Sequence, residues 1–121
     1  LKEQGSGAIV NTASLAGIIG SPKLSAYSLS KGAVVNFTRS IAAEIGPHGV
    51  RANAVCPGVV ETPMLEAAAD EDDYVQEMIE QTPGGIGQPA DVANVVAFLA
   101  SDRSRYVNGA VIPVDGGYTA R

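Results

Sequence analysis

The sequence predicts an α/β domain built on a doubly wound parallel sheet. Short apolar runs that are typical of buried strands alternate along the chain with longer segments of helical periodicity. Each predicted strand is a nearly continuous apolar run, which indicates a parallel sheet covered by helices on both faces. We expect three strands and about three to four helices, joined by right-handed crossovers.

The first half of the chain predicts a strand, a loop and a long helix. A buried strand is expected over residues 8–13, after the break at Gly5–Gly7, and a loop over residues 17–22. A helix is expected from Ser25, as its N-cap, to the stop at Gly46-Pro47. Apolar residues recur in it at a four-residue interval and are predicted to line one helix face: Leu29, Ala33, Phe37, Ile41 and Ile45.

The second half predicts two further strands and two helical regions. Residues 50–56 form a strand that Pro57-Gly58 stops, and residues 63–81 are helical, amphipathic and acidic. Pro89 suits the first position of the next helix. That helix has an apolar stripe at Val92, Val95, Val96 and Leu99. The last strand is expected over residues 110–114, closed by Asp115-Gly116-Gly117.

Charge and hydropathy exclude several classes of partner. The net charge of −5 arises from residues 61–80, where eight acidic residues and no basic residue occur. No basic stripe for nucleic acid is present, and no apolar run reaches the roughly 20 residues that a membrane helix needs. A solvated helix face is the favoured interpretation of the acidic segment, over a metal or a basic partner, and we expect no bound metal.

Length and the single cysteine bear on location and completeness. One cysteine among 121 residues cannot form an internal disulfide, so we expect a reducing compartment and a cytoplasmic protein. The chain opens at Leu1, without an initiator methionine, and its first predicted strand has a bare edge. We therefore expect residues 1–121 to be one half of a single domain about twice as long.

A tyrosine and a lysine stand four residues apart at the start of the long helix. Tyr27 and Lys31 then lie on one helix face, one turn apart. A free tyrosine titrates near pH 10, and a neighbouring positive charge favours the phenolate. Such a tyrosine can give a proton to a carbonyl oxygen or take one from a hydroxyl group. The alternative is a cation beside an aromatic ring on an exposed helix turn.

Two strand ends supply further polar groups. Ser14 follows the first strand, and Thr62 lies in the turn that begins at Pro57 after the second strand. Because ligands bind at the carboxyl ends of parallel strands, these groups and Tyr27 are predicted to meet in one crevice. Ser14 could there bond a reacting oxygen as it gains charge. Each segment alone would be an ordinary turn.

These motifs together resemble the short-chain dehydrogenase/reductase family. The resemblance rests on Asn11-Thr12-Ala13-Ser14, Tyr27-Ser28-Leu29-Ser30-Lys31, Arg51-Ala52-Asn53-Ala54-Val55-Cys56-Pro57-Gly58 and Val114-Asp115-Gly116-Gly117, in the family's order over the whole chain. It is closest to the single-domain branch that includes 3-oxoacyl-ACP reductase-like enzymes. The Tyr-to-Lys spacing argues against the enoyl reductases of the family. The implied fold is the C-terminal half of a Rossmann-like domain.

The resemblance also implies a role for each residue. Tyr27 would be the general acid/base, Ser14 would polarise the oxygen of a small alcohol or ketone substrate, and both would contact that substrate. Lys31 would hold the ribose of NAD or NADP, Pro57 and Gly58 would lie along the nicotinamide, and Val60 and Thr62 would bind its carboxamide. Residues from about Met64 to Gly85 would form a mobile lid, with the acidic run 70–73 at its outer part.

Parts of the family pattern are missing from the chain, which leaves alternatives open. The glycine-rich phosphate turn and the residue that separates NAD from NADP are not found. The activity implied is NAD(P)-dependent interconversion of a secondary alcohol and a ketone. The alternatives are a catalytically incompetent fragment or a pseudoenzyme that acts through self-association. The resemblance suggests a homodimer or homotetramer for the full-length protein, through residues 25–45 and 110–114.

Overall fold

The computed structural model describes residues 1–69 and 73–120, and its centre is a parallel sheet of three strands. The strands are β1 (Gly7–Thr12), β2 (Val50–Pro57) and β3 (Val111–Val114), in the order β1-β2-β3. Asn11 pairs with Ala54, and Val55 with Ile112. The predicted α/β class and the three strands are confirmed, with strand bounds that differ from the prediction by one residue. Strand β1 lies at an edge of the sheet, as predicted.

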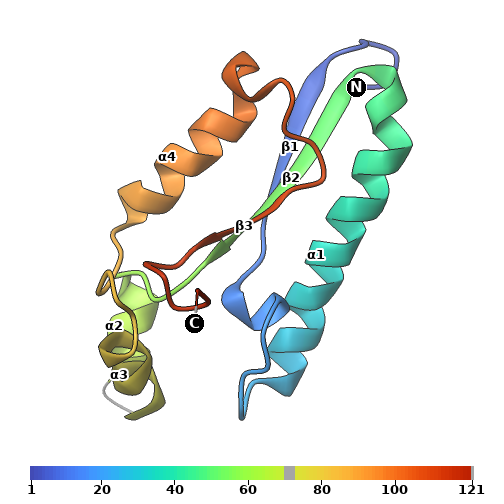
Figure 1. Ribbon diagram of the computed structural model, residues 1–121. Coiled ribbons are helices and arrows are strands. Elements are labelled where there is room, and N and C mark those ends of the chain that lie inside the picture. The colour runs from blue at the N-terminus through green and yellow to red at the C-terminus, as the bar shows by residue number, and fades with distance from the viewer. Residues whose placement is uncertain (70–72, 121) are drawn as a thin grey trace.

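Two helices cover the sheet, one on each face. Helix α1 (Ser25–Ile45) and helix α4 (Pro89–Ala100) lie on opposite sides of the strands (Figure 1). Cys56 packs with Ala13 and Val35 on the α1 side. Helices therefore cover both faces of β2, and the five successive residues from Ala52 to Cys56 are buried.

The apolar stripe predicted for one face of α1 does not stay on one face. Leu29 and Phe37 are 76% and 59% exposed, whereas Ile41 and Ile45 are half-buried. A four-residue interval advances by about 400° around a helix of 3.6 residues per turn, so the stripe drifts by about 40° at each step. The residues of α1 that are buried are Val35, Thr38 and Ala42.

The start of α1 also differs from the prediction. Leu24 is the N-cap, without a side-chain hydrogen bond, and Ser25 is the first helical residue. The chain turns sharply before it: Lys23 has a φ of 66°, and the Leu24 amide donates to the Ser21 carbonyl at 3.2 Å. This turn brings the chain into the helix one residue earlier than expected, so Ser25 cannot act as the cap.

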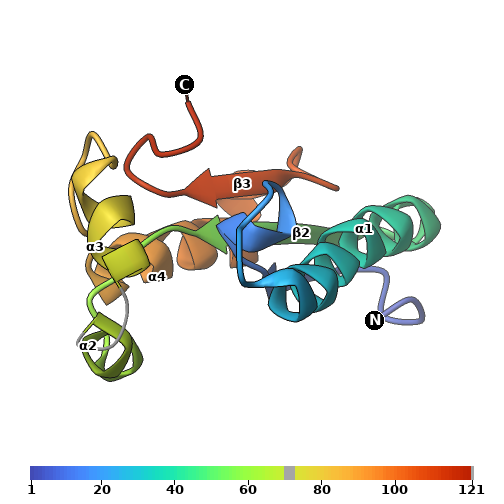
Figure 2. The same ribbon diagram turned by 90° about the horizontal axis from the view of Figure 1, so that it is seen from below.

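The region predicted to be helical, residues 63–81, contains two described helices, α2 (Pro63–Ala69) and α3 (Asp73–Glu80). Both lie beyond the carboxyl end of β2 (Figure 2). In α3 the acidic residues Asp73, Glu77 and Glu80 are exposed, and Val75 and Met78 are half-buried, which confirms the predicted amphipathic pattern there. The acidic residues 70–72 lie outside the described part of the chain.

Helix α4 begins at Pro89, as predicted, and its start is fixed by Asp91, whose Oδ2 accepts from the Gln88 amide at 2.7 Å. Leu99 is fully buried, and Val92, Val95 and Val96 are half-buried. Within residues 1–69 and 73–120, no helix has the length and apolar character needed to cross a bilayer.

Candidate active site at the carboxyl ends of the strands

The predicted site residues line one cavity, with one exception. The cavity has a volume of about 370 Å³ and lies where β1 and β2 end and α1 begins. Its walls include Ser14, Tyr27, Pro57, Gly58, Val60 and Thr62, whereas Lys31 is not among its lining residues. The structure therefore brings together residues that are up to 48 positions apart in the chain, from Ser14 to Thr62.

Ser14 is held at the start of a short 3-10 helix, η1 (Leu15–Gly17). Its Oγ accepts a hydrogen bond from the Ala16 amide at 3.2 Å. Leu15 and Ala16 are buried, which fixes the turn. The turn role and the proposed site role are thus compatible, because an accepting hydroxyl group keeps its own hydrogen for a second partner.

Tyr27 and Lys31 occupy the first two turns of α1, on one side of the helix. The Lys31 ammonium lies 5.7 Å from the centre of the Tyr27 ring and donates to the Thr12 carbonyl at 3.5 Å. Tyr27 is 43% exposed and lines the cavity. Among the described residues, its hydroxyl group has no hydrogen-bond partner. The hydroxyl group is therefore free to meet a bound molecule.

Gly17 sets the distance between the serine turn and α1. A Cβ atom at Gly17 would lie 2.8 Å from the backbone carbon and oxygen of Lys31. Only glycine permits η1, which follows Ser14, to approach α1 so closely. From the sequence, Gly17 is predicted only to begin a loop. Its close contact with α1 could not be predicted, because a close approach of two backbones leaves no signal in composition or periodicity.

The segment after β2 is fixed by backbone contacts on two sides. The Gly58 amide donates to the Val114 carbonyl at 3.0 Å. Val60 forms an isolated parallel bridge with Gly87, in which the Glu61 amide donates to the Gly87 carbonyl and the Gly87 amide to the Val59 carbonyl. In such a bridge the amide and carbonyl of Val60 itself point to the opposite side.

Thr62 ends this segment and begins α2. Its Oγ1 accepts from the Leu65 amide at 3.2 Å, as an N-cap does. The hydroxyl hydrogen is not used in this bond. Thr62 can therefore cap the helix and donate to a ligand at the same time.

Several cavity residues were not singled out as site residues by the sequence analysis. Leu24, Val75 and Tyr74 contribute to the walls. Val75 could have been found, because it lies three residues before Met78 and on the same face of α3. Leu24 carries no such signal, since it stands in a turn whose direction the sequence does not specify.

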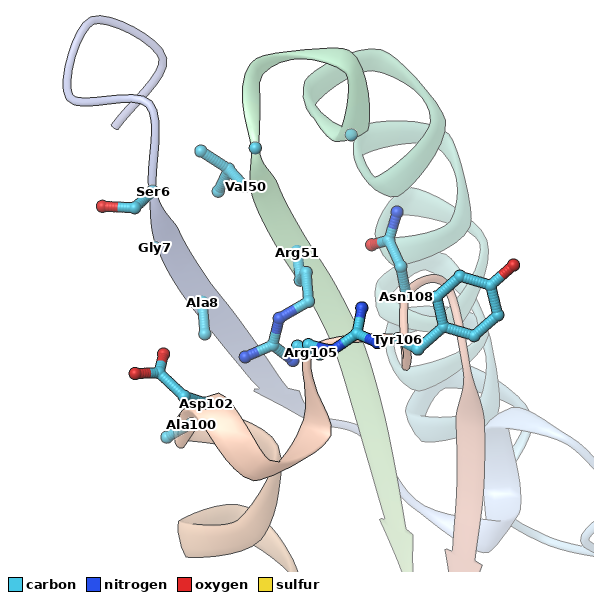
Figure 3. Close-up of a pocket in the computed structure, with 12 residues that line it drawn as sticks. Ser6, Gly7, Ala8, Val50, Arg51, Ala100, Asp102, Arg105, Tyr106 and Asn108 are labelled. Carbon is cyan, nitrogen blue, oxygen red and sulfur yellow. The ribbon is translucent and has the colours of Figure 1, made fainter.

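A second cavity, of about 530 Å³, lies at the opposite end of the sheet and was not predicted (Figure 3). Arg51 enters it from β2, but the guanidinium group is bound by the protein. Its Nη1 donates to Ser104 Oγ at 2.8 Å and to the carbonyls of Leu99 and Val107 at 3.1 and 3.4 Å, and its Nη2 donates to the Ser101 carbonyl at 3.0 Å. Arg51 thus binds carbonyl groups at the C-terminal end of α4 and is not available as an anion-binding group.

Two groups near the first cavity have pKa values shifted from their ordinary range. Burial raises the pKa of the Cys56 thiol, which agrees with its packing as a small apolar residue against Ala13 and Val35. Partial desolvation opposes ionisation of Asp115, but hydrogen bonds from Thr119 and the Gly117 amide outweigh it and lower the pKa of Asp115. In the part of the chain that the structure describes, no three His, Cys, Asp or Glu residues are grouped as metal ligands.

Comparison with known proteins identifies relatives over the whole chain. A family model described as Enoyl-(Acyl carrier protein) reductase matches residues 1–119. The chain is 46% identical over 118 residues to 2-(R)-hydroxypropyl-CoM dehydrogenase of Xanthobacter autotrophicus, covering 97% of the chain and 47% of that protein. It is 43% identical over 127 residues to levodione reductase of Leifsonia aquatica, covering 99% of the chain and 48% of that protein.

Solved structures agree with these matches. The crystal structure of a levodione reductase has a TM-score of 0.92 and 44% identity, over 98% of the chain and 49% of that structure. A gluconate 5-dehydrogenase from Burkholderia cenocepacia, in complex with NADP and tartrate, has a TM-score of 0.91 and 33% identity, over 99% of the chain and 48% of that structure. The chain spans about half the length of the relatives that it matches.

Proposed function

The chain belongs to the short-chain dehydrogenase/reductase family, and from this membership we propose that it is the C-terminal, catalytic half of an NAD(P)-dependent oxidoreductase. The reaction that we propose is the interconversion of a secondary alcohol and a ketone. The relatives named above are dehydrogenases and a reductase, which supports an oxidoreductase. The four-residue spacing from Tyr27 to Lys31 favours chemistry at a hydroxyl-bearing carbon over enoyl reduction.

The observation that carries the proposal is the shared cavity of Ser14 and Tyr27. One wall offers the hydroxyl group of a serine at a strand end, and another offers a tyrosine whose hydroxyl group is free. The Lys31 ammonium lies over the Tyr27 ring, 5.7 Å from the ring centre. A substrate oxygen placed between the two hydroxyl groups would meet one hydrogen-bond donor and one acid/base.

The residues present fit the nicotinamide end of the cofactor. The amide and carbonyl of Val60 point away from the bridge with Gly87, and the Thr62 hydroxyl keeps its hydrogen. Together they offer the donors and the acceptor that a carboxamide group needs. The Lys31 ammonium has three N–H donors, and its contact with the Thr12 carbonyl is long at 3.5 Å, so it can also bond ribose hydroxyl groups.

The chain's own residues then perform the proton transfer. When bound, the nicotinamide supplies or accepts the hydride. In the oxidative direction the Tyr27 phenolate takes the proton of the substrate hydroxyl group, while the C–H bond of the same carbon breaks with loss of hydride and the C=O bond of the ketone forms. Ser14 donates to the substrate oxygen throughout. In the reductive direction Tyr27 returns the proton to the oxygen.

The test uses the full-length protein, produced from the coding sequence that includes the region upstream of Leu1. Alcohols and ketones of several classes are assayed with NAD(H) and NADP(H) by the absorbance of the reduced cofactor. We expect cofactor-dependent turnover of at least one class. Absence of turnover in both directions and with both cofactors, in a protein that binds neither of them in a calorimetric titration, would overturn the proposal.

Self-association through α1 is a second proposal, favoured by a specific observation. Leu29 and Phe37 expose large apolar side chains on the outer side of this helix. A second copy of the chain would bury them, as the predicted homodimer or homotetramer requires. Sedimentation of the 121-residue chain, followed by titration with NADH and NADPH, separates a self-associating fragment from one that also binds cofactor.

A further inference from the structure

The cavity that contains Ser14 and Tyr27 has no charged lining residue in the described part of the chain. Its polar side-chain groups are hydroxyl groups, from two serines, one threonine and two tyrosines. Hydroxyl groups can donate and accept hydrogen bonds, but they cannot neutralise a full charge. A carboxylate, sulfonate or phosphate placed in this cavity would lose water without gaining a counter-ion.

The lid side of the cavity is apolar. Helix α2 contributes Met64 and Leu65, and helix α3 contributes Val75 and Met78 together with Tyr74. These helices lie together beyond the carboxyl end of β2, where they face the ends of the strands (Figures 1 and 2). The walls that would contact the body of a substrate, away from its reacting oxygen, therefore favour hydrocarbon.

The exposed acidic side chains of the lid helices repel anions. The acidic side chains of the described lid helices, which include Glu66, Asp73 and Glu77, are exposed and do not line the cavity. No lysine, arginine or histidine occurs between residues 61 and 80 to balance them. These exposed carboxylates give the outer face of the lid a local negative charge, which disfavours the approach of anionic molecules.

The cation of Lys31, which lies beside Tyr27, is not directed into the cavity. Lys31 lies against the face of Tyr27 and the Thr12 carbonyl, and it is not a lining residue of the cavity. In the proposed function its ammonium serves the ribose. It is therefore not available to pair with an acidic group on the substrate.

Resting on the proposed function, we infer that the substrate is an uncharged, largely apolar secondary alcohol or its ketone, and that this cavity discriminates against substrates that bear an anionic group. The cavity volume of about 370 Å³ admits a cyclic or branched carbon skeleton beside the nicotinamide. Selectivity arises from two properties of this chain, the uncharged walls and the acidic outer face of the lid.

The experiment compares matched pairs of alcohols in the full-length protein. Each pair has the same ring and the same reacting hydroxyl group, and differs in one remote substituent, a carboxylate or its methyl ester. Cyclopentane, cyclohexane and bicyclic rings provide three such pairs. We expect kcat/KM to be about 100-fold higher for the neutral member of each pair, because the anion would be buried without a partner.

A positive charge introduced at the lid should weaken this preference. Met64 lines the cavity and is 80% exposed, so Met64→Arg adds a cation at the wall with little effect on folding. Within each pair, we expect it to raise the ratio of kcat/KM for the carboxylate to kcat/KM for the ester about 10-fold. Gln76→Arg is the matched control, because Gln76 is exposed on the outer side of α3 and does not line the cavity.

The outcomes distinguish this inference from the proposed function. Equal or faster turnover of the carboxylates by the unmodified enzyme overturns the inference and leaves the oxidoreductase function intact. If Gln76→Arg and Met64→Arg raise kcat/KM for the carboxylates, relative to the esters, by the same factor, the assignment of selectivity to the cavity wall is overturned. Failure of every alcohol and ketone with both cofactors overturns the proposed function, and the inference with it.

Discussion

The ammonium nitrogen of Lys31 lies 5.7 Å from the centre of the Tyr27 ring, one helical turn further along α1. This position is a consequence of the four-residue spacing, which places both side chains on one side of the helix. The tyrosine hydroxyl group is left free to face the cavity that Ser14 also lines. One turn of helix therefore separates a cation from the tyrosine that we propose as the proton-transfer group.

Replacement of Tyr27 by phenylalanine tests the proton-transfer role. Phenylalanine retains the ring but lacks the hydroxyl group, so we expect kcat in the full-length enzyme to fall by about 10²–10⁴-fold. The affinity for the cofactor, measured by fluorescence titration, should change little. Tyr106→Phe is the matched control, because the Tyr106 ring is highly exposed and does not line the cavity that contains Ser14 and Tyr27. Near-native turnover by Tyr27→Phe would contradict the assignment.

Gly17→Ala tests whether the close approach of η1 to α1 positions Ser14. The new Cβ would lie 2.8 Å from the Lys31 backbone, which cannot move aside as a flexible side chain could. We expect a loss of about 1–3 kcal/mol in the free energy of unfolding and a reduced kcat. The control is Gly20→Ala, where no heavy atom lies within 4 Å of the added Cβ. Similar effects of the two substitutions on urea unfolding would refute the packing argument.

Arg51→Met tests the structural role given to the arginine of the second cavity. Methionine keeps an apolar stem but loses the hydrogen bonds to Ser104 and to the carbonyl groups of Leu99, Ser101 and Val107. We expect a loss of roughly 2–4 kcal/mol in the free energy of unfolding, measured by chemical denaturation. Arg105→Met, at an exposed residue of the same cavity, should change it by less than about 0.5 kcal/mol. Equal losses would indicate that the hydrogen bonds of Arg51 contribute little to stability.

Phe37→Glu tests self-association through α1. The side chain is 59% exposed, so the substitution should not unfold the helix, but it would place a charge in an apolar contact. We expect the oligomer to dissociate, with a dissociation constant at least about 10-fold higher in sedimentation equilibrium. Gln76→Glu introduces the same charge on the outer face of α3 and should leave the oligomer intact. An unchanged oligomer in Phe37→Glu would exclude this helix face as the interface.

The sequence predicted what depends on short-range pattern, and it failed where geometry in three dimensions decides. The strands, the start of α4 and the meeting of Ser14, Tyr27 and Thr62 follow from apolar runs, capping residues and the rule for parallel strand ends. The prediction that the apolar residues of α1 share one helix face was wrong, because a four-residue interval drifts around the helix by about 40° at each step. Gly17 was missed because contact between two backbones has no pattern in the sequence.

Asp115 makes the folded state sensitive to acid. Its Oδ2 accepts from the Thr119 amide and hydroxyl groups at 2.9 and 2.6 Å, and its Oδ1 accepts from the Gly117 amide at 3.1 Å. Although partial desolvation opposes ionisation, these bonds lower the pKa of Asp115 in the folded state. The stabilisation is fully present above the unfolded value of about 3.9, and it is lost as the pH falls through the lower folded value.

Asp115→Asn should therefore lower Tm at about pH 7, and the difference in Tm from the unmodified protein should shrink as the pH falls below about 4. Thr119→Val removes the shortest of the three bonds and should show a smaller difference in Tm with the same dependence on pH. Calorimetric scans of the three proteins at several pH values measure this directly. A difference in Tm that stays constant from about pH 7 to about pH 3 would mean that Asp115 acts through its shape and hydrogen bonds alone, without a contribution from its charge.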